Sequence, residues 1–264
     1  MPLWAYNVPS WLLATIMVVV IEGVSLLGLL LARRFLIPRL HFHDGVNDAI
    51  SGTVQAIGVF YGITVGLIAV AVWNTSSASA DLVSREAASL GVLYRDVSGY
   101  PSPIRDSLRS GVRDYTVTII EKVWPGQKEG RVVNAGTPIL DNLQAHLYAF
   151  EPSTPGQVAL HGETLGAYNK LFEYRRLRVD AVESGLSSVM WVVIWIGAAI
   201  SIGVAYFYKI DDAKLHLILV SLMAGFLGIV LFMIVVNDRP FFGYASIPSE
   251  PYRLVLERVI QVVP

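Results

Sequence analysis

Residues Trp11–Ala32 read WLLATIMVVVIEGVSLLGLLLA, an unbroken apolar run in which the only charged side chain is Glu22. A helix needs roughly 20 such residues to cross the hydrocarbon core of a bilayer. The run is longer than the apolar core of a signal peptide, and no Lys or Arg precedes it, so we interpret it as a retained transmembrane helix. This stretch therefore assigns the chain to a membrane.

Three more stretches share this length and composition: Ala49–Trp73, Val189–Tyr208 and Leu215–Val236. Over the whole chain only 16% of residues are charged, compared with about 25% in soluble domains. Trp and Tyr residues, which favour the headgroup level of a bilayer, stand at several edges of the stretches. We therefore predict a multi-pass membrane protein with four transmembrane helices, two on each side of a more polar segment.

The polar segment is expected to be a soluble helical bundle, because it has helical periodicity and no alternating strand pattern. Prolines near the expected helix starts divide it into separate elements. The expected helices are Ser77–Val97; a second from Pro103, capped by Ser102, to about Val123, ending before Trp124-Pro125-Gly126; a short one opening at Thr137-Pro138; and a long one from Ser153-Thr154-Pro155 to about Glu183.

These elements predict an all-α integral membrane protein in which transmembrane helices flank a soluble helical bundle. The predicted organisation is two transmembrane helices in 1–75, the soluble helical domain in 76–186, two transmembrane helices in 187–237 and a C-terminal tail in 238–264. We expect the short tail to pack on the helical domain.

Positive charges give conflicting indications about orientation. Arg33, Arg34 and Arg39 follow the first apolar run, and the positive-inside rule places such a loop in the cytoplasm. The soluble domain and both termini would then lie on the other side of the membrane. An arginine cluster expected at headgroup level, and a single arginine after the fourth run, favour the opposite orientation: Arg175, Arg176 and Arg178, and Arg239.

Glu22 is the only acidic residue well inside any of the four runs. A carboxylate exposed to lipid at that depth costs several kcal/mol, so it must face another helix, face a water-filled path or be protonated. Two interpretations remain open. One is a residue of an ion or proton pathway, and the other is a protonated acid hydrogen-bonded to a neighbouring helix.

The second run carries a series of small residues, Gly58, Gly62 and Gly66. Ser51 and Gln55 continue this stripe at helical spacing, and Ala69 and Trp73 extend it. Such a face allows close packing of another helix. It also suits a pore, where small side chains keep the lumen open and polar groups replace the water contacts of an ion. Packing and pore lining both remain open, and they coincide if this helix surrounds the axis of an oligomer.

Arg105, Arg109 and Arg113 recur every four residues and share one face of a predicted helix. An oligomer would gather these arginines into a basic vestibule that concentrates anions. The simpler interpretation is a solvated face on which the arginines pair with Asp106 and Asp114.

No residue pattern indicates catalysis, a cofactor or a metal, so we expect no enzyme. The sequence lacks a P-loop, a dinucleotide fingerprint, an HExxH motif and a nucleophile elbow. It has no cysteine, which excludes disulfides and thiolate chemistry, and its net charge of -1 disfavours nucleic acid as a partner. Two groups of potential ligands lack a metal-binding spacing and are interpreted as solvated: His41, His43, Asp44 and Asp48, and His146, His161 and Glu163.

Short motifs, spread in order along nearly the whole chain, resemble the bestrophin-like membrane proteins of bacteria. The resemblance implies a protein of the bacterial inner membrane, and none of the motifs is catalytic. The motifs are Arg33-Arg34, Val70 to Trp73, Glu86-Ala87, Leu93-Tyr94-Arg95, Pro101 to Pro103, Leu108-Arg109, Glu121 to Pro125, Arg175 to Arg178, Gly185-Leu186, Trp191 and Asp238 to Phe241.

The resemblance points to bestrophins, and it implies a pentameric anion channel with two spans, a cytoplasmic helical region and two more spans. In bestrophins the second span lines the pore with an apolar, aromatic neck. This chain departs from that pattern, because its second span is rich in glycine around Phe60 and Tyr61 and no acidic calcium-binding cluster follows its fourth run. Calcium gating and anion selectivity are therefore not carried over.

The sequence as a whole favours a homo-oligomeric, channel-like membrane protein, with five subunits if it follows the resembled family. Its expected partners are the lipid bilayer, other copies of itself and inorganic ions. The first two spans would lie nearest the axis, with Gln55, Gly58, Gly62 and Gly66 facing the pore and Glu22 nearby. The alternative is a non-conducting scaffold or accessory subunit whose helical domain binds another protein, and a proton-coupled carrier would rest on Glu22 alone.

Overall fold

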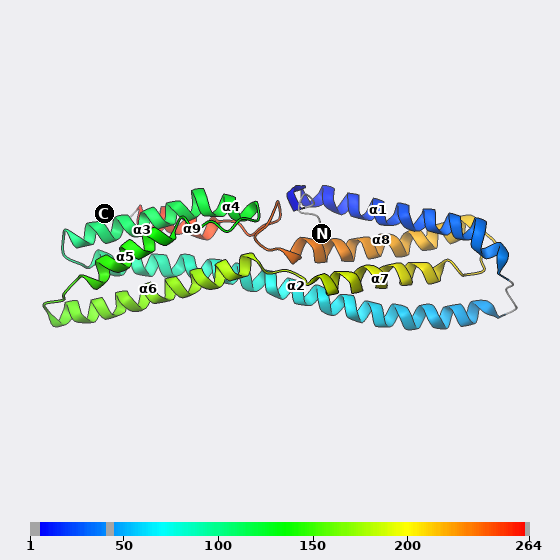
Figure 1. Cartoon of the computed structure of the whole chain (residues 1–264), viewed down its shortest axis with the longest axis horizontal. Coiled ribbons are helices and arrows are strands. Elements are labelled where there is room, and N and C mark those ends of the chain that lie inside the picture. The colour runs from blue at the N-terminus through cyan, green and yellow to red at the C-terminus, as the bar shows by residue number, and fades with distance from the viewer. Residues whose placement is uncertain (1–5, 41–44, 262–264) are drawn as a thin grey trace. The chain divides into compact units, whose positions relative to one another are not determined.

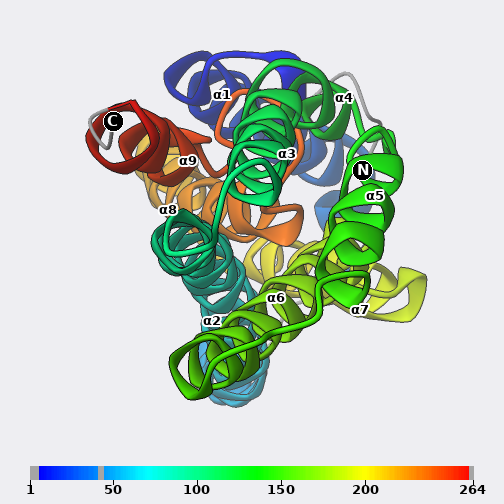
Figure 2. The ribbon, with the colours of Figure 1, turned by 90° about the vertical axis from the view of Figure 1, so that its left-hand side faces the viewer.

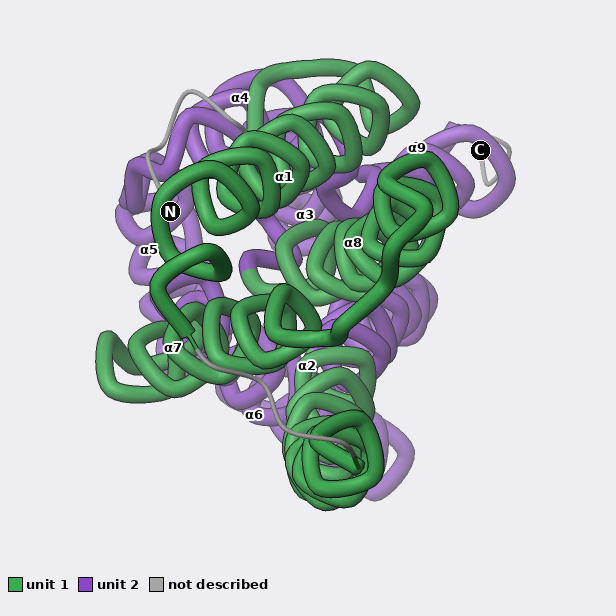
Figure 3. The backbone as a smooth tube through the Cα atoms, turned by 90° about the vertical axis from the view of Figure 1, so that its right-hand side faces the viewer, with its two compact units in different colours: residues 1–75, 185–238 green, residues 76–184, 239–264 purple. Residues whose placement is uncertain are grey.

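The computed structural model describes residues 6–40 and 45–261, and within these ranges every regular element is a helix (Figure 1). The chain divides into two compact units (Figure 3). Unit 1 comprises residues 1–75 and 185–238, and unit 2 comprises residues 76–184 and 239–264. Each unit is therefore assembled from two separate stretches of the sequence.

Among the described residues, four helices are long and apolar enough to cross a membrane. They are α1 (Ser10–Leu31), α2 (Val46–Ser98), α7 (Ser188–Ala205) and α8 (Ala213–Asp238). After α1 the chain continues through a π-helical turn, Ala32–Leu36, and a short 3-10 turn, Ile37–Arg39. The four predicted transmembrane helices, and the all-α membrane fold that they define, are therefore confirmed.

Helix α1 packs along α8, where glycines on α8 allow the two helices to approach closely. A Cβ atom at Gly228 would lie 3.1 Å from the Val18 Cα atom, and one at Gly225 would lie 2.6 Å from Oε1 of Glu22. Larger residues at these positions would hold the two backbones apart. Figures 1 and 3 show α1 and the first part of α2 on opposite sides of unit 1, with α7 and α8 between them.

Helix α2 runs for 53 residues without interruption and contributes residues to both units. The sequence predicts two separate helices here, one ending at Trp73 and another beginning at Ser77, and this expectation is wrong. The intervening residues, Asn74 to Ser76, include neither Gly nor Pro, so nothing ends the helix. At about 1.5 Å per residue, α2 extends for about 80 Å, well beyond a hydrocarbon core of about 30 Å.

The helices of unit 2 pack around a core of apolar and aromatic side chains. Figure 2 views this unit end on and shows α3 between α5 and α9. Tyr115 of α3, Leu171 of α6 and Tyr252 of the C-terminal tail are fully buried in the core. Besides the second part of α2, the elements are α3 (Ile104–Thr118), a π turn (Ile119–Val123), α4 (Trp124–Lys128), α5 (Thr137–Tyr148), α6 (Pro155–Val182), α9 (Glu250–Val255) and a second π turn (Leu256–Ile260).

Two expected helix ends in unit 2 are wrong. The N-cap of α3 is Pro103, and the Ser102 hydroxyl instead donates to the Asp106 carboxylate at 2.8 Å. The helical path also continues past Val123, because the π turn leads directly into α4. Pro125 lies in the first turn of α4, next to the π turn.

The predicted starts of α5 and α6 are confirmed. Helix α5 begins at Thr137, and α6 begins at Pro155. The Thr154 hydroxyl accepts a hydrogen bond from the Gln157 N–H at 3.2 Å, which caps the N-terminus of α6.

Candidate functional site

The side of α2 that carries the glycine series is not covered by any described part of the chain. A Cβ atom at Gly58, Gly62 or Gly66 would meet no heavy atom within 4 Å. Gln55 is exposed as well. We call Gln55, Gly58, Gly62 and Gly66 the α2 open face. Within the described residues, no helix of the same chain packs against these three glycines.

A neighbouring side of α2 packs on α7 and is fixed there by Tyr61. The Tyr61 hydroxyl donates to the Ile194 carbonyl at 3.0 Å, and the Tyr61 ring occupies the place where a Cβ atom at Gly197 would stand. Val65 and Ala69 continue this buried side. These contacts set the rotation of α2 about its own axis, and that rotation leaves the α2 open face uncovered.

The chain itself engages the predicted glycine stripe on both sides of its glycines, because Ala69 is buried and Ser51 is hydrogen-bonded. The Ser51 hydroxyl oxygen accepts a hydrogen bond from the Tyr208 hydroxyl at 3.2 Å. Tyr208 belongs to the loop between α7 and α8, so this loop covers the stripe near the start of α2. The uncovered part of the stripe therefore begins after Ser51.

Glu22 lies in the interface between α1 and α8. The Ser221 hydroxyl donates to Oε1 of Glu22 at 3.4 Å, and the same oxygen occupies the space left by Gly225. This placement agrees with an acid that is hydrogen-bonded to a neighbouring helix. Helix α1, which carries Glu22, and the first part of α2 lie on opposite sides of unit 1 (Figures 1 and 3).

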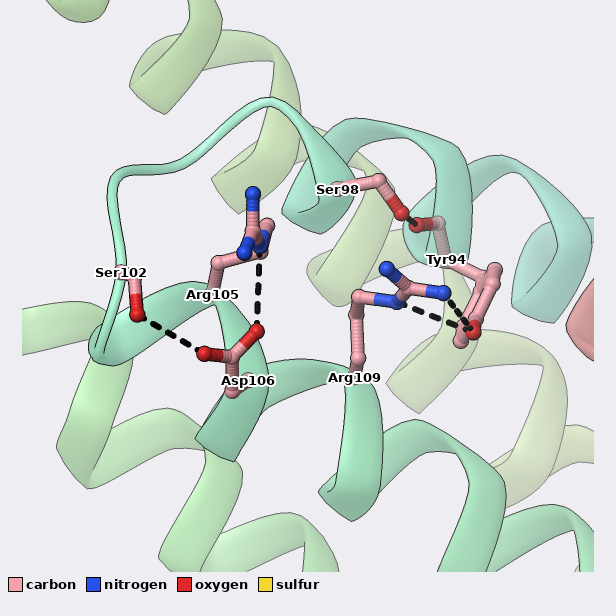
Figure 4. Close-up of polar contacts among 6 residues, drawn as sticks. All are labelled: Tyr94, Ser98, Ser102, Arg105, Asp106 and Arg109. Atoms are coloured by element: carbon pink, nitrogen blue, oxygen red, sulfur yellow. Dashed lines mark hydrogen bonds and ion pairs between the residues drawn. The ribbon is translucent and has the colours of Figure 1, made fainter. Parts of the chain in front are cut away.

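Two of the three arginines on the predicted basic face make local contacts (Figure 4). The Nε atom of Arg105 pairs with the Asp106 carboxylate at 3.1 Å. Arg109 donates from Nε and Nη2 to the Tyr94 hydroxyl at 3.0 and 2.8 Å, and its guanidinium lies over the Tyr94 ring. Arg113 is exposed. The simpler interpretation was that these arginines pair with nearby aspartates, and Arg105 does so through Asp106.

The Asp106 carboxylate is stabilised in its ionised form by its neighbours. Hydrogen bonds from Ser102 and then from Arg105 lower the pKa of Asp106. Asp106 therefore stays ionised, and paired with Arg105, at a lower pH than an isolated aspartate would.

Two opposite charges, Glu86 and Arg178, are fully buried in unit 2, and the sequence did not indicate that they pair. The Nε atom of Arg178 donates to Oε2 of Glu86 at 2.6 Å, and the Tyr115 hydroxyl donates to Oε1 at 2.9 Å. The Arg178 guanidinium also lies 5.5 Å from the centroid of the Trp124 ring. The expectation that Arg178 lies at headgroup level is wrong, because its charge is compensated inside unit 2.

Burial shifts the pKa values of Tyr115 and Arg178 in this cluster. It raises the pKa of Tyr115 well above its usual value, and the adjacent Glu86 carboxylate adds to the shift. Burial alone would lower the pKa of Arg178, but the Glu86 carboxylate, together with Tyr252 and Tyr115, more than reverses this effect. Arg178 therefore stays charged and Tyr115 stays neutral, so the cluster is a fixed structural ion pair.

Asp238, at the end of α8, connects three segments of unit 1. Its Oδ1 atom accepts from the Leu186 N–H at 2.6 Å, and its Oδ2 atom accepts from the Tyr6 hydroxyl at 3.0 Å. Asp238, Leu186, Glu86 and Arg178 all belong to the motifs on which the bestrophin-like resemblance rests. The shared motifs are therefore the feature of the sequence from which these buried contacts could have been predicted. The residues of these motifs stabilise the fold.

No group of three or more His, Cys, Asp or Glu residues suited to a metal ion occurs in the described residues. The Nδ1 atom of His161 is 2.7 Å from the Tyr100 hydroxyl, and the Nδ1 atom of His146 is 2.8 Å from the Asn142 carbonyl. His41, His43 and Asp44 lie outside the described residues.

Four long apolar helices and a second helical unit define an all-α integral membrane protein. Residues 19–252 match the sequence profile of the Bestrophin-like domain, and the chain belongs to the bestrophin-like family. No curated protein sequence matches the chain significantly.

Solved structures share this fold at low sequence identity. A bacterial bestrophin homolog from Klebsiella pneumoniae, crystallised as a leucine-to-threonine variant, gives a TM-score of 0.66 at 8% identity and covers 94% of this chain and 99% of its own. A crystal structure described as a membrane protein, a glycine-to-alanine variant, gives a TM-score of 0.66 at 10% identity and covers 95% and 99%. Identities this low establish a shared fold alone.

Proposed function

We propose that this protein forms a homo-oligomeric ion channel in which α2 lies next to the axis and the α2 open face lines the pore. The observation that carries the proposal is that this face stays uncovered within its own chain, while Tyr61 holds the adjoining side of α2 on α7. Small residues leave room for a lumen, and the Gln55 amide can replace the water contacts of an ion. Membership of the bestrophin-like family supports the proposal, since the resemblance implies a pentameric anion channel.

In this proposal, a bilayer surrounds unit 1 and water surrounds unit 2. Helix α2 is much longer than a hydrocarbon core is thick. Its part in unit 2 also carries charged residues, among them Asp81, Arg85 and Arg95, which are costly in lipid. The partners in this proposal are the lipids of a bacterial inner membrane, further copies of the chain and inorganic ions.

Cysteine scanning tests the pore assignment, because the chain contains no cysteine of its own. Gln55→Cys, Gly58→Cys and Gly62→Cys would each be reconstituted in planar bilayers and treated with a charged, water-soluble thiol reagent. We expect the reagent to reduce the current in these three variants. Phe60→Cys and Leu67→Cys are matched controls, since both side chains are exposed on another part of α2, and they should not respond.

Each outcome of this scan has a distinct meaning. Block at Phe60→Cys and Leu67→Cys, with none at the open-face positions, would show that the apolar side of α2 faces the pore instead. Bilayers that stay silent under varied pH, voltage and calcium would reject the channel. A fixed stoichiometric protein partner, recovered with a silent protein, would then favour the scaffold or accessory subunit.

The role of Glu22, which lies in the α1–α8 interface, can be tested by substitution. If Glu22 belongs to the ion pathway, Glu22→Gln should change the ion selectivity of the current. If it only connects α1 to α8, the selectivity should stay the same. The hydrogen bond from Ser221 favours the second result.

Arg113 is the best candidate for a basic vestibule, because its side chain is exposed and those of Arg105 and Arg109 are engaged. Arg113→Gln should reduce an anion current more at low salt than at high salt, since salt screens exposed charges. Arg85→Gln, which removes an exposed arginine paired with Asp81, is the matched control and should have a smaller effect.

A further inference from the structure

One end of unit 1 combines four helix termini with an excess of positive charge. Helices α1 and α7 end there, α2 and α8 begin there, and Figure 3 views unit 1 from this side. Because these helices are long and apolar enough to cross a bilayer, we expect their termini to lie at the level of the lipid headgroups. Among the described residues of this end, basic side chains outnumber acidic ones: Arg33, Arg34, Arg39, Lys209 and Lys214 against Asp48, Asp211 and Asp212.

The loop between α7 and α8, residues 206–212, is held in place by side chains from two other segments of unit 1. Arg33, in the π turn after α1, donates from Nη1 to the Ile210 carbonyl at 3.1 Å. Asn47, at the start of α2, donates to the Lys209 carbonyl at 3.1 Å and accepts from the Lys209 N–H at 2.9 Å. These contacts use the backbone of the loop, so they position Lys209 next to Arg33 without using the Lys209 ammonium group.

A cavity of about 330 Å³ lies beside this loop, and its lining includes Arg33, Lys209 and Asp211. The Arg33 guanidinium has five N–H donors, and its contacts with the loop and with His216 occupy three of them. Within the described part of the chain, no carboxylate forms an ion pair with Arg33 or Lys209. The cavity therefore offers two cations with unused donors, an arrangement that suits the oxygens of a phosphate group.

A second cavity, of about 190 Å³, adjoins the first, and Tyr208 and Ile210 line both of them. The rest of its lining is mostly apolar and includes Val54 of α2 together with Leu219 and Met223 of α8. A cavity with positive charge therefore stands next to an apolar cavity among the ends of the transmembrane helices. A phospholipid has the same arrangement, with a charged phosphate next to apolar acyl chains.

We propose that these two cavities bind one molecule of an anionic phospholipid. Its phosphate lies between Arg33 and Lys209, and the first part of an acyl chain occupies the apolar cavity beside Val54. A free phosphate ion would use the polar cavity alone, whereas a lipid fills both.

The charges at this end of unit 1 favour a headgroup with a net negative charge. Basic side chains outnumber acidic ones there, and Asp211 is the one lining residue that opposes an anion. A lipid bound in this way connects the turn after α1 with α2 and α8. The site belongs to unit 1 alone and does not depend on ion conduction.

Lipid titration of the purified, delipidated protein in detergent, followed by native mass spectrometry, tests the site without measuring any current. We expect dioleoylphosphatidylglycerol to bind more tightly than dioleoylphosphatidylcholine. Lys209→Gln should weaken the binding of phosphatidylglycerol about fivefold, as expected for the loss of one basic residue near an anionic headgroup. The loop should stay in place, because its bonds to Asn47 use the Lys209 backbone. Lys214→Gln, which removes an exposed lysine of the same end that lines neither cavity, is the matched control and should change the affinity little.

Two further substitutions test the cavities themselves. Val54→Phe fills the apolar cavity and should weaken the binding of phosphatidylglycerol. Val59→Phe is its control, because Val59 is exposed on the same helix and lines neither cavity. Asp211→Asn removes the carboxylate from the polar cavity and should strengthen the binding of phosphatidylglycerol.

Each contrary result overturns a stated part of the proposal. Equal losses of affinity in Lys209→Gln and Lys214→Gln would indicate general attraction between charges and overturn the site. Displacement of the lipid by inorganic phosphate, with no effect of Val54→Phe, would assign the polar cavity to a free anion. Tighter binding of phosphatidylcholine, or weaker binding of phosphatidylglycerol in Asp211→Asn, would overturn the choice of an anionic headgroup. A protein that conducts no ions but binds the lipid as expected would reject the channel and support the lipid site.

Discussion

At the scale of single residues, the buried pair of Glu86 and Arg178 is the most sensitive point of unit 2. Replacing Glu86 with Gln leaves the Arg178 guanidinium buried without a compensating charge. Removing one partner of a buried ion pair costs about 3–5 kcal/mol. We therefore expect Glu86→Gln to lower the free energy of unfolding by about this amount, measured by thermal or denaturant unfolding in detergent.

An exposed ion pair in the same helix is the matched control. Arg85 pairs with Asp81 on the surface of α2, where both side chains are more than half exposed. Such pairs contribute about 0–1 kcal/mol, so Arg85→Gln should change stability little. A second test combines Glu86→Gln with Arg178→Met, which should recover part of the loss because no charge is then left buried. Equal stability of Glu86→Gln and the unsubstituted protein would contradict the role assigned to the pair.

Gly197 is the residue on which the position of Tyr61 depends. A Cβ atom there would overlap the Tyr61 ring, whose hydroxyl is bonded to the Ile194 carbonyl. We expect Gly197→Ala to displace Tyr61 from α7 and to destabilise the protein by about 1–3 kcal/mol, as measured by its unfolding midpoint in detergent.

Gly203 is the matched control on the same helix, because a Cβ atom there would meet nothing within 4 Å. Gly203→Ala should be neutral or slightly stabilising, since alanine favours a helix more than glycine does. If both alanine variants behave alike, the Tyr61–Gly197 contact does not hold α2 on α7.

At the scale of whole elements, the sequence predicts the transmembrane helices well and their connections less well. Apolar runs of sufficient length have one stable outcome in a bilayer, which is a helix. The end expected at Trp73 was wrong, because a change from apolar to polar residues does not end a helix when neither Gly nor Pro follows. The stop expected before Trp124 was wrong because Pro125 is compatible with the first turn of a new helix.

The contacts that define the candidate site were largely beyond the sequence. Glu86 and Arg178 are separated by 92 positions along the chain, and nothing local indicates that they meet. The glycine stripe could be recognised from its spacing, but its side of α2 could equally have been packed or open. Contacts between two different helices, such as that of Tyr61 with Gly197, show which side of α2 is packed within the chain.

The α1–α8 interface allows a prediction about how two elements fit together. A Cβ atom at Gly228 would meet the Val18 backbone, which cannot move aside as a flexible side chain can. Gly228→Leu should therefore separate the two helices and lower the unfolding midpoint in detergent. Gly23→Leu is the control on α1, since a Cβ atom at Gly23 meets nothing within 4 Å. A similar loss in both variants would point to a general intolerance of bulk and not to this interface.

At the scale of the whole molecule, the proposed pore requires more than one copy of the chain around the α2 open face. Glycines expose their backbone, and a backbone in contact with lipid gains nothing from the missing side chains. Another copy of the chain or an aqueous lumen would use the space that they leave. Images of purified particles should therefore show a closed ring with an opening on the axis, as a head-to-tail interface that closes on itself produces.

Filling that opening provides the sharpest test of the whole arrangement. Gly62 has an empty space beside it in the single chain, so Gly62→Trp should leave each subunit folded. If the α2 open face lines the pore, several copies of the indole ring should meet at the axis and abolish the current, while the particles keep their symmetry. Leu67→Trp, which places the same ring on an exposed apolar part of α2, should leave the current largely intact. If Gly62→Trp instead breaks the ring into single subunits, the glycines pack against the next copy, and the lumen must be lined by a different part of α2.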